Sequence, residues 1–431
     1  MRTVGIIAEY NPFHTGHRYH IQKAKECAQA EFAVVVMSPD FVQRGTPAVF
    51  DKYTRTEMAL LGGADLVLEL PVCYASGSAE YFARGAVSVL DALGIVDVLA
   101  FGCEAQNQEL VNCFCETARL LEEEPPKYRS TLRQLLKEGQ TFPQARAAAV
   151  KACSGEAAAA LLAAPNNVLG TEYCRALGRL HSRISPLPIP RCGSGYDHPL
   201  LEGEFCSATA LREVLLAKAN RSGNSLQEAC DAFSALRYIP EECRKLFCQA
   251  SRMPLWPDDL LPLLYEKFLA CAEYEEILDF SPELSDRVRK LRFSCIGNSY
   301  KETVSLLKTR QITEARIRRA LLHLILGTRT EDLRNYAAHG TVFYARILGF
   351  RRSAAPLLHT IRKRSGLPLL SKPSASAALL ETTYREDPPR CSLALHMLSQ
   401  DYYASHLYQA VRSCRYRIPF HSEYQRSPIV L

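Results

Sequence analysis

A short segment near the N-terminus holds the residues best suited to chemistry. His14, Gly16 and His17 stand in the order His-Thr-Gly-His, after an apolar run over residues 3–8 and the turn residue Pro12. Histidines three positions apart lie on one face of a first helical turn. Each imidazole can donate a hydrogen bond to a phosphate oxygen, and Gly16 has no side chain to keep a phosphate from the backbone. The segment is therefore suited to bind phosphate groups.

A helix that begins in this segment would strengthen the phosphate site. Its first N–H groups are free, and its dipole places positive charge at the N-terminus. Attack at the α-phosphorus of ATP builds negative charge on the α-phosphate and the departing pyrophosphate, and fixed donors there accelerate the attack. We therefore interpret His14 and His17 as the catalytic residues of an ATP site. The alternative is a pair of surface histidines at the start of a helix.

The elements around this motif alternate between strand and helix over the first 102 residues. Apolar runs predict strands over residues 3–8, 32–37, 66–70 and 96–101, and helical spacing predicts helices over 17–28, 54–61 and 78–93. Continuous apolar strands separated by helices indicate a parallel sheet that is covered on both faces. We expect a doubly wound α/β fold, in which ligands bind outside the carboxyl ends of the strands.

The remaining chain is predicted to be mainly helical. Residues 108–180 have helical spacing, 184–190 form an extended segment, and Ser207 is placed as the N-cap of a helix over 207–217. A polar, turn-like stretch over 220–224 suggests a domain boundary. We expect an N-terminal doubly wound parallel-sheet domain over 1–220 and a mainly α-helical domain over 221–431. The Pro-rich segments 254–262 and 366–373 are predicted to be loops.

Charge is distributed unevenly along the chain. The 431 residues carry a net charge of +6, yet residues 286–365 contain 18 Lys and Arg against 5 Asp and Glu. The rest of the chain is therefore mildly acidic. Arginines cluster at 316–319, 351–352 and 362–364. Such asymmetry predicts a polyanion-binding region; a solvated helical surface is the alternative.

Several compositional features point to a cytoplasmic protein with no membrane partner. The 16 cysteines are scattered and form no C-x-x-C pair, so neither a zinc ribbon nor a disulfide scaffold is expected. No run of 18 or more apolar residues occurs, and the N-terminus has no signal-peptide pattern. No metal-ligating cluster is predicted.

The motifs together resemble a known family, the bacterial tRNA(Met) cytidine acetate ligases of the HxGH superfamily of adenylyltransferases and class I aminoacyl-tRNA synthetases. The resemblance covers nearly the whole chain and is most specific at residues 5–20. It is carried by the segments 37–45, 62–71, 312–319 and 346–350, and by Phe101-Gly102-Cys103-Glu104, Pro165-Asn166-Asn167-Val168-Leu169-Gly170, Pro190-Arg191 and Ser207-Ala208-Thr209-Ala210-Leu211-Arg212. The chain departs from the family pattern at Pro39-Asp40 and Asp197-His198.

The resemblance implies a ligase that uses ATP in two steps. Acetate attacks the α-phosphate of ATP to give acetyl-adenylate and pyrophosphate. The N4 amine of the wobble cytidine of elongator tRNA(Met) then takes the acetyl group, which yields N4-acetylcytidine and AMP. ATP, acetate and tRNA are thus the expected substrates. Mg²⁺ is expected with ATP, and Glu9 is interpreted either as part of its shell or as a residue that orients the loop.

The expected ATP-binding residues surround the carboxyl ends of the strands. Gly102 leaves room for adenine or ribose, Asn166 or Asn167 reads an adenine edge or a ribose hydroxyl, and Arg191 holds phosphate. The whole set is Ile7, Ala8, Glu9, Tyr10, Asn11, Pro12, Phe13, His14, Thr15, Gly16, His17, Arg18, Tyr19, His20, Gly102, Asn166, Asn167, Arg191 and Ser207. Without the family pattern, a turn glycine, a helix-cap asparagine and a surface arginine are the alternatives.

Two other functions remain open at this point. An adenylyltransferase that acts on a small phosphate-containing substrate would use the same phosphate site, but it would leave the basic tract over 286–365 unexplained. An RNA-binding protein with a degenerate nucleotide fold would use the basic tract alone, although His14, Gly16 and His17 are all present.

Overall fold

The fold is built around one eight-stranded sheet. The computed structural model describes residues 1–104, 110–191, 206–219, 235–270 and 273–431. The strand order is β10-β8-β5-β2-β1-β6-β7, with β9 beside β8, and every pair is parallel except β5 with β8. The strands are β1 (Thr3–Ala8), β2 (Phe32–Met37), β5 (Leu66–Glu69), β6 (Val98–Cys103), β7 (Ser185–Pro190), β8 (Ala345–Phe350), β9 (Leu369–Leu370) and β10 (Ile429–Val430).

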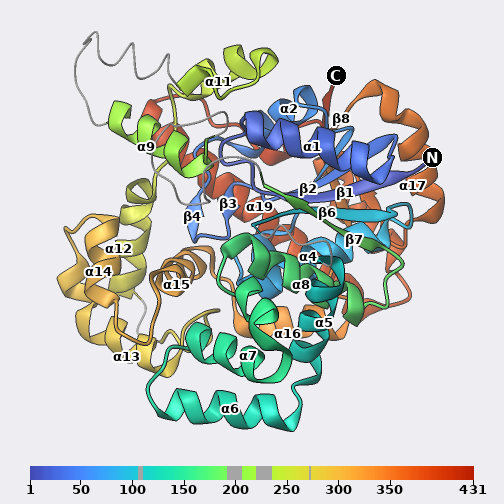
Figure 1. Cartoon of the computed structure of the whole chain (residues 1–431). Coiled ribbons are helices and arrows are strands. Elements are labelled where there is room, and N and C mark those ends of the chain that lie inside the picture. The colour runs from blue at the N-terminus through green and yellow to red at the C-terminus, as the bar shows by residue number, and fades with distance from the viewer. Residues whose placement is uncertain (105–109, 192–205, 220–234, 271–272) are drawn as a thin grey trace.

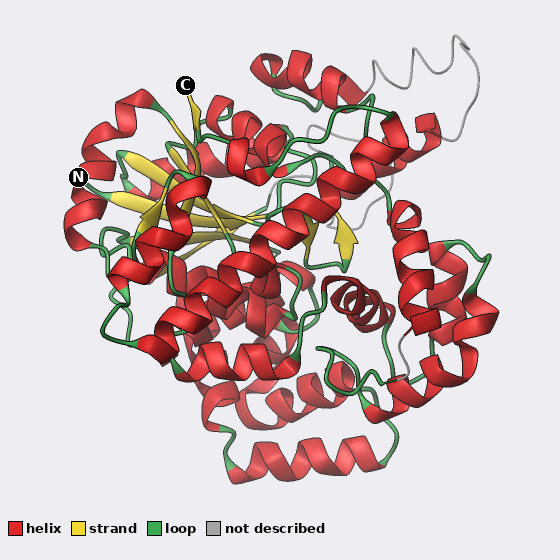
Figure 2. Cartoon of the chain, turned by 180° about the vertical axis from the view of Figure 1, so that it is seen from behind, coloured by secondary structure: helices red, strands yellow, loops and turns green. Residues whose placement is uncertain are grey.

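Helices cover both faces of this sheet, which confirms the α/β prediction (Figures 1 and 2). Along β2, Val34 and Val36 belong to one core and Val35 and Met37 to the other, as expected for a strand that is buried on both sides. The helices of the first half are α1 (Thr15–Ala28), α2 (Lys52–Leu61), α3 (Val72–Ala75), α4 (Ala79–Ala92), α5 (Leu110–Glu123), α6 (Pro126–Lys137), α7 (Phe142–Leu161), α8 (Pro165–Arg179) and α9 (Ala208–Ala219).

The second half is mainly helical, as predicted. Its helices are α11 (Arg244–Ala250), α12 (Leu261–Ala270), α13 (Pro282–Leu291), α14 (Tyr300–Leu307), α15 (Glu314–Leu326), α16 (Thr330–Ala338), α17 (Ala355–Arg364), α18 (Pro373–Thr383) and α19 (Pro388–Tyr416). Short 3-10 turns join them, among them η2 (Pro257–Leu260) within the predicted loop over 254–262 and η5 (Glu423–Gln425) near the C-terminus. Helices α12, α14 and α15 share a third core.

The expectation that everything after residue 220 is helical was wrong at three places. Strands β8, β9 and β10 come from this half and join the sheet beside β5, and β9 lies inside the predicted loop over 366–373. A short, mostly apolar segment such as β8 has no periodicity that separates it from a buried helix. The boundary near 220 lies outside the described residues and stays a prediction; the sheet takes strands from both sides of it.

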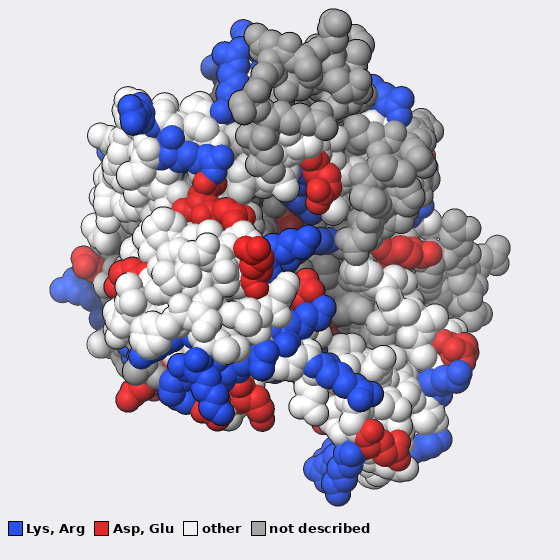
Figure 3. Space-filling view, turned by 90° about the vertical axis from the view of Figure 1, so that its left-hand side faces the viewer, with Lys and Arg blue, Asp and Glu red and all other residues white. Residues whose placement is uncertain are grey.

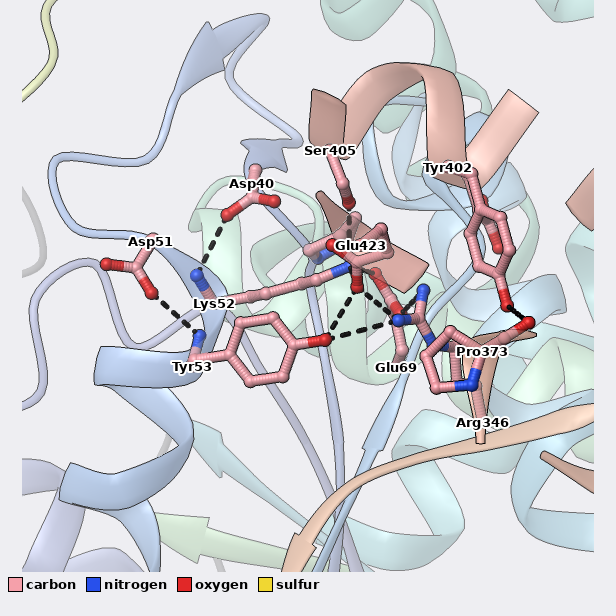
Figure 4. Close-up of polar contacts among 12 residues, drawn as sticks. Asp40, Asp51, Lys52, Tyr53, Glu69, Arg346, Pro373, Tyr402, Ser405 and Glu423 are labelled. Atoms are coloured by element: carbon pink, nitrogen blue, oxygen red, sulfur yellow. Dashed lines mark hydrogen bonds and ion pairs between the residues drawn. The ribbon is translucent and has the colours of Figure 1, made fainter. Parts of the chain in front are cut away.

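A buried group of charges joins these late strands to the early part of the chain (Figure 4). Lys52 Nζ lies 2.6 Å from Glu69 Oε1 and 2.9 Å from Glu423 Oε1. Arg346 Nη1 lies 2.9 Å from Glu69 Oε2, and its Nη2 also contacts Glu423. Tyr53 donates its hydroxyl hydrogen to Glu423 Oε1 at 2.6 Å. None of the four charged side chains is more than 3% exposed, so each charge depends on its partners.

Replacing Glu423 by glutamine should therefore destabilise the protein. Lys52 and Arg346 would be left to share the single carboxylate of Glu69, and an uncompensated buried charge costs about 3–5 kcal/mol. Urea unfolding measures the change. The matched control is Glu26→Gln, which removes an exposed ion pair with Lys23 and should leave unfolding nearly unchanged. A loss for Glu423→Gln as small as that of the control would show that the buried charges do not support the fold.

Among the described residues, no single helix is long and apolar enough to cross a membrane. Only α7 and α8 reach that length and hydropathy as a pair, and they are bent by 118° at their junction.

Candidate active site

The loop between β1 and α1 is fixed from both sides. Asn11 Oδ1 accepts a hydrogen bond from the Val49 N–H at 2.9 Å, and the Asn11 carbonyl accepts one from Arg212 Nη1 at 2.7 Å. Phe13 is fully buried and lies so close to Gly62 that a Cβ there would come within 2.3 Å of its ring. The loop thus reaches the start of α1 with little freedom to move.

His14 and His17 cap the start of α1 in a reciprocal way. His14 Nδ1 accepts a hydrogen bond from the Gly16 N–H at 3.1 Å, and His17 Nδ1 accepts one from the His14 N–H at 3.3 Å. The two rings stack with centroids 3.7 Å apart. Because each Nδ1 is an acceptor, each neutral ring carries its hydrogen on Nε2. The two histidines therefore supply a pair of Nε2–H donors.

Burial keeps the imidazoles of this site neutral. Burial, with the positive charges of Arg191 and Arg212, lowers the pKa of His14 to about 3. The pKa of His17 is also far below its usual value, because of burial first and the neighbouring His14 second. Burial, together with the positive charge of Arg191, likewise lowers the pKa of His20 to about 4. An anionic ligand in contact with these rings would oppose that shift.

A cavity opens in front of this helix start, at the carboxyl ends of β1, β6 and β7. Fourteen of the nineteen predicted ATP-binding residues line it: Ile7, Ala8, Glu9, Tyr10, Asn11, His14, Gly16, His17, Tyr19, His20, Gly102, Asn166, Arg191 and Ser207. His20 Nε2 and the Tyr10 hydroxyl are buried and have no hydrogen-bond partner among the described residues. Such groups are donors or acceptors that a ligand can use.

Five predicted residues do not line the cavity, and each has a structural role or position instead. Phe13 packs in the core, and Pro12 forms the cis bond after Asn11. Thr15 donates its N–H to the Tyr238 carbonyl at 2.7 Å. Arg18 forms an exposed ion pair with Glu242 at 3.1 Å, away from the cavity.

The fifth of these residues is Asn167, which stands next to Asn166 at the start of α8. Asn167 is buried, and its Oδ1 accepts a hydrogen bond from the Glu104 N–H at 2.9 Å, which holds the chain after β6. Asn166 lines the cavity, and its amide donates to the Glu104 carboxylate. Of the pair, Asn166 is thus the one in a position to contact a ligand.

Two further elements supply charge and backbone donors. Arg191 follows β7 and lies beside Gly102, where an added Cβ would meet its Cγ at 3.3 Å. Ser207 Oγ accepts the Ala210 N–H at 3.0 Å, which confirms Ser207 as the N-cap of α9. Arg212, one turn later, also lines the cavity. The first turn of α9 thus directs its positive dipole end toward the same space as α1.

Glu9 is the one carboxylate among the described residues that line the cavity. Its Oε1 accepts a hydrogen bond from the Gln43 N–H at 3.0 Å, and its carbonyl accepts one from Arg55 Nη1 at 2.6 Å. Arg55 is fully buried and also holds the carbonyls of Ser38 and Phe50. The described residues contain no group of three or more His, Cys, Asp or Glu side chains arranged to hold a metal.

The structure adds lining residues that were not predicted as ligands. They are Ile6, Gln43, Arg44, Phe82, Phe101, Leu169, Tyr173, Ile189, Pro190, Cys206, Ala208 and Thr209. Most flank predicted residues along the same strands and helix starts. Phe82 comes from the first turn of α4, and no local signal distinguishes it from a core residue.

A strand–loop–helix with His-Thr-Gly-His at the carboxyl edge of a mostly parallel sheet defines a nucleotidyltransferase of the HxGH class. The family described as HIGH Nucleotidyl Transferase matches residues 1–419. The tRNA(Met) cytidine acetate ligase of Caldanaerobacter subterraneus subsp. tengcongensis is 37% identical over 376 residues, which are 86% of this chain and 89% of the relative. That of Acetivibrio thermocellus is 36% identical, over 86% and 88% of the two chains.

Solved structures agree with the sequence relatives. Thermotoga maritima TmcAL bound with α-thio ATP matches over 100% of both chains, with a TM-score of 0.87 and 31% identity. Its apo form gives a TM-score of 0.89 and 32% identity. The present chain therefore belongs to the tRNA(Met) cytidine acetate ligase family, within the HIGH nucleotidyltransferases.

Proposed function

We propose that this protein is an ATP-dependent ligase that activates acetate as acetyl-adenylate. It then transfers the acetyl group to N4 of the wobble cytidine of elongator tRNA(Met), in the cytoplasm. The observation that carries the proposal is the pair of Nε2–H donors on His14 and His17, which faces a cavity beside two helix N-termini. Further support comes from relatives of this name that match most of the chain and from the ATP analogue bound to the Thermotoga maritima protein.

The first step is displacement at the α-phosphorus. The triphosphate occupies the space between the starts of α1 and α9, with Arg191 and Arg212 balancing its charge. An acetate oxygen bonds to the α-phosphorus while the bond from the α-phosphorus to the bridging oxygen breaks, and pyrophosphate leaves with that electron pair. Charge grows on oxygens that the imidazole Nε2–H groups of His14 and His17 contact, so these fixed donors stabilise the transition state.

The second step is acyl transfer. The N4 amine of the cytidine attacks the acetyl carbon, the bond from that carbon to the phosphate oxygen breaks, and AMP leaves. The amine releases one proton to solvent water. AMP departs with an extra negative charge, which the same histidines and arginines stabilise.

Mg²⁺ would enter with ATP. Carboxylate and phosphate oxygens are the ligands that Mg²⁺ prefers. Glu9 supplies the one carboxylate among the described lining residues, and phosphates and water would supply the rest. When bound, the ion would neutralise charge on the triphosphate.

The basic tract over 286–365 divides between two ends of the molecule. Helix α17 ends at Arg364, which packs on Gly94 shortly before the amino end of β6. Helices α13–α15 lie at the opposite, carboxyl edge of the sheet (Figure 1). Several arginines of the tract serve the fold: Arg346 is in the buried charge group, and Arg319 forms a two-pronged contact with Asp279 at 2.9 and 3.1 Å.

The α13–α15 end is therefore the better candidate to contact tRNA. It lies on the cavity side, and it carries the exposed Lys290 and Arg310 beside a second hollow. Basic and acidic side chains are mixed on the face drawn in Figure 3. A few cations directed at phosphates, rather than a continuous basic surface, thus form the proposed RNA contact.

Charge reversal tests this assignment. The double variant Lys290→Glu and Arg310→Glu should weaken tRNA binding by about tenfold or more, because each lost phosphate contact also forfeits counterion release. The matched control is Arg362→Glu with Lys363→Glu on α17, an equal change of charge at the far end. Filter binding at several salt concentrations measures both. Equal losses of tRNA affinity in the two double variants would show that α13–α15 makes no specific contact with tRNA.

Acetate dependence separates the proposed function from its alternatives. Exchange of labelled pyrophosphate into ATP should require acetate and need no RNA. An adenylyltransferase for a small phosphate-containing substrate would show exchange without acetate once that substrate is added. A purely RNA-binding protein would show no exchange with any acceptor.

A further inference from the structure

A small hairpin connects the cavity to the helical region. Strands β3 (Phe41–Val42) and β4 (Thr46–Pro47) pair antiparallel, and Figure 1 shows them between the sheet and α15. At the base of the hairpin, the Asp40 carbonyl accepts the Ala48 N–H at 2.8 Å and Asp40 Oδ1 accepts the Lys52 N–H at 2.8 Å. The ends of the hairpin are thus fixed to the start of α2.

The tip of the hairpin borders the cavity. Gln43 and Arg44 are half-buried and line it, and the Gln43 N–H donates to Glu9 Oε1 at 3.0 Å. The hairpin follows β2, whereas Gly102 lies at the carboxyl end of β6 and Arg191 follows β7. In the strand order, β2 lies on one side of β1, and both β6 and β7 lie on its other side. Arg44 therefore approaches the cavity from the side opposite to the proposed nucleotide contacts.

The back of the hairpin rests directly on α15. Gly45 has φ +73°, and a Cβ there would lie 2.4 Å from the backbone of Arg318 and Arg319. The Tyr300 hydroxyl of α14 donates to the Gly45 carbonyl at 3.2 Å. Only glycine permits this combination of conformation and close approach. The position of the hairpin tip thus depends on α14 and α15, which belong to the end of the molecule that we propose binds tRNA.

We propose that this hairpin guides the acceptor nucleotide into the cavity, and that Arg44 contacts the RNA during acetyl transfer but is not needed for acetyl-adenylate formation. The inference rests on the proposed function. A nucleotide that enters from α13–α15 must pass the tip, and its phosphate is a ligand suited to a guanidinium there. The proposed ATP contacts lie at Gly102, Asn166 and Arg191 and at the starts of α1 and α9, so none of them includes Arg44.

The test compares the two half-reactions in Arg44→Ala and Arg44→Lys. Acetate-dependent pyrophosphate exchange should stay within about threefold of the unmodified protein, whereas transfer to saturating tRNA should fall about 10–100-fold in Arg44→Ala, the loss typical of a hydrogen bond to a charged group. Arg44→Lys should recover part of the transfer, because it keeps the charge without the bidentate geometry. Equal loss of both half-reactions, or loss of neither, would overturn the inference.

A second pair of variants tests the seating of the hairpin on α15. Gly45→Val should also reduce transfer more than exchange, because its side chain cannot fit against the Arg318 backbone. Gly297→Val is the matched control, since Gly297 has φ +90° and open space around its Cβ position. Equal behaviour of the two variants would contradict the role of the contact. If the unmodified protein showed no acetate-dependent exchange, the proposed function itself would fail, which is a different result from any of these.

Discussion

Replacing His14 or His17 by alanine is expected to lower acetyl-adenylate formation by about 10²–10³-fold, the usual cost of losing one fixed donor to developing charge. The geometry gives the reason: a backbone N–H occupies each imidazole Nδ1, so Nε2–H is the donor that each ring can offer in the cavity that both residues line. Acetate-dependent pyrophosphate exchange measures the effect.

A substitution at position 14 can separate the two roles of His14, which are to cap α1 and to donate a hydrogen bond to the ligand. In His14→Asn, the amide oxygen stands where Nδ1 stood and can still accept the Gly16 N–H, because asparagine is a preferred N-cap. Its side chain is too short to replace Nε2–H. Thermal unfolding of His14→Asn should stay near that of the unmodified protein while exchange is lost. Full exchange in His14→Asn would mean that His14 only caps the helix. The exposed His339→Ala serves as the control for histidine loss.

Gly102→Val is expected to weaken ATP binding by about 10–100-fold, as overpacking of a fitted site does. Gly102 lies at the carboxyl end of β6 and lines the cavity, so its missing side chain leaves space there. An added Cβ meets only the flexible Arg191 side chain at 3.3 Å, whereas the two methyl groups of valine would fill ligand space. Isothermal titration with a non-hydrolysable ATP analogue measures the change.

A graded series checks the cause of that loss. Gly102→Ala should bind ATP nearly as well as the unmodified protein, because Arg191 can move by a few tenths of an ångström. Unchanged affinity in Gly102→Val would move the nucleotide away from the end of β6. If the melting temperature of Gly102→Val fell together with its ATP affinity, the loss of binding would instead come from destabilisation of the sheet.

Local patterns were sufficient to predict the first half of the sheet. Strands β1 and β2 have the predicted bounds, because an apolar run bounded by turn residues leaves few other structures for a six-residue segment. Helix α4 differs from the prediction by one residue at each end, with Ser78 before it and Leu93 after it. The placement of His14, Gly102 and Arg191 around one cavity then followed from the rule that parallel strands end at a common edge.

Long-range features could not be predicted in this way. The charge group of Lys52, Glu69, Arg346 and Glu423 joins residues far apart in the chain, and no local spacing indicates such a pairing. Strand β8 was missed for the same reason, since its partner β5 lies in the other half of the chain. The prediction of one basic region over 286–365 assumed that the charges of this stretch lie on one surface. Counting charges along the sequence cannot show that an arginine such as Arg346 is buried.

The most direct test of the account is incubation of the protein with ATP, labelled acetate and elongator tRNA(Met), followed by nucleoside analysis. We expect the label in N4-acetylcytidine at the wobble position, with AMP and pyrophosphate formed in equal amounts and with no product when acetate, ATP or the RNA is left out. Unlabelled tRNA under these conditions, or formation of ADP and phosphate in place of AMP and pyrophosphate, would contradict the proposed reaction.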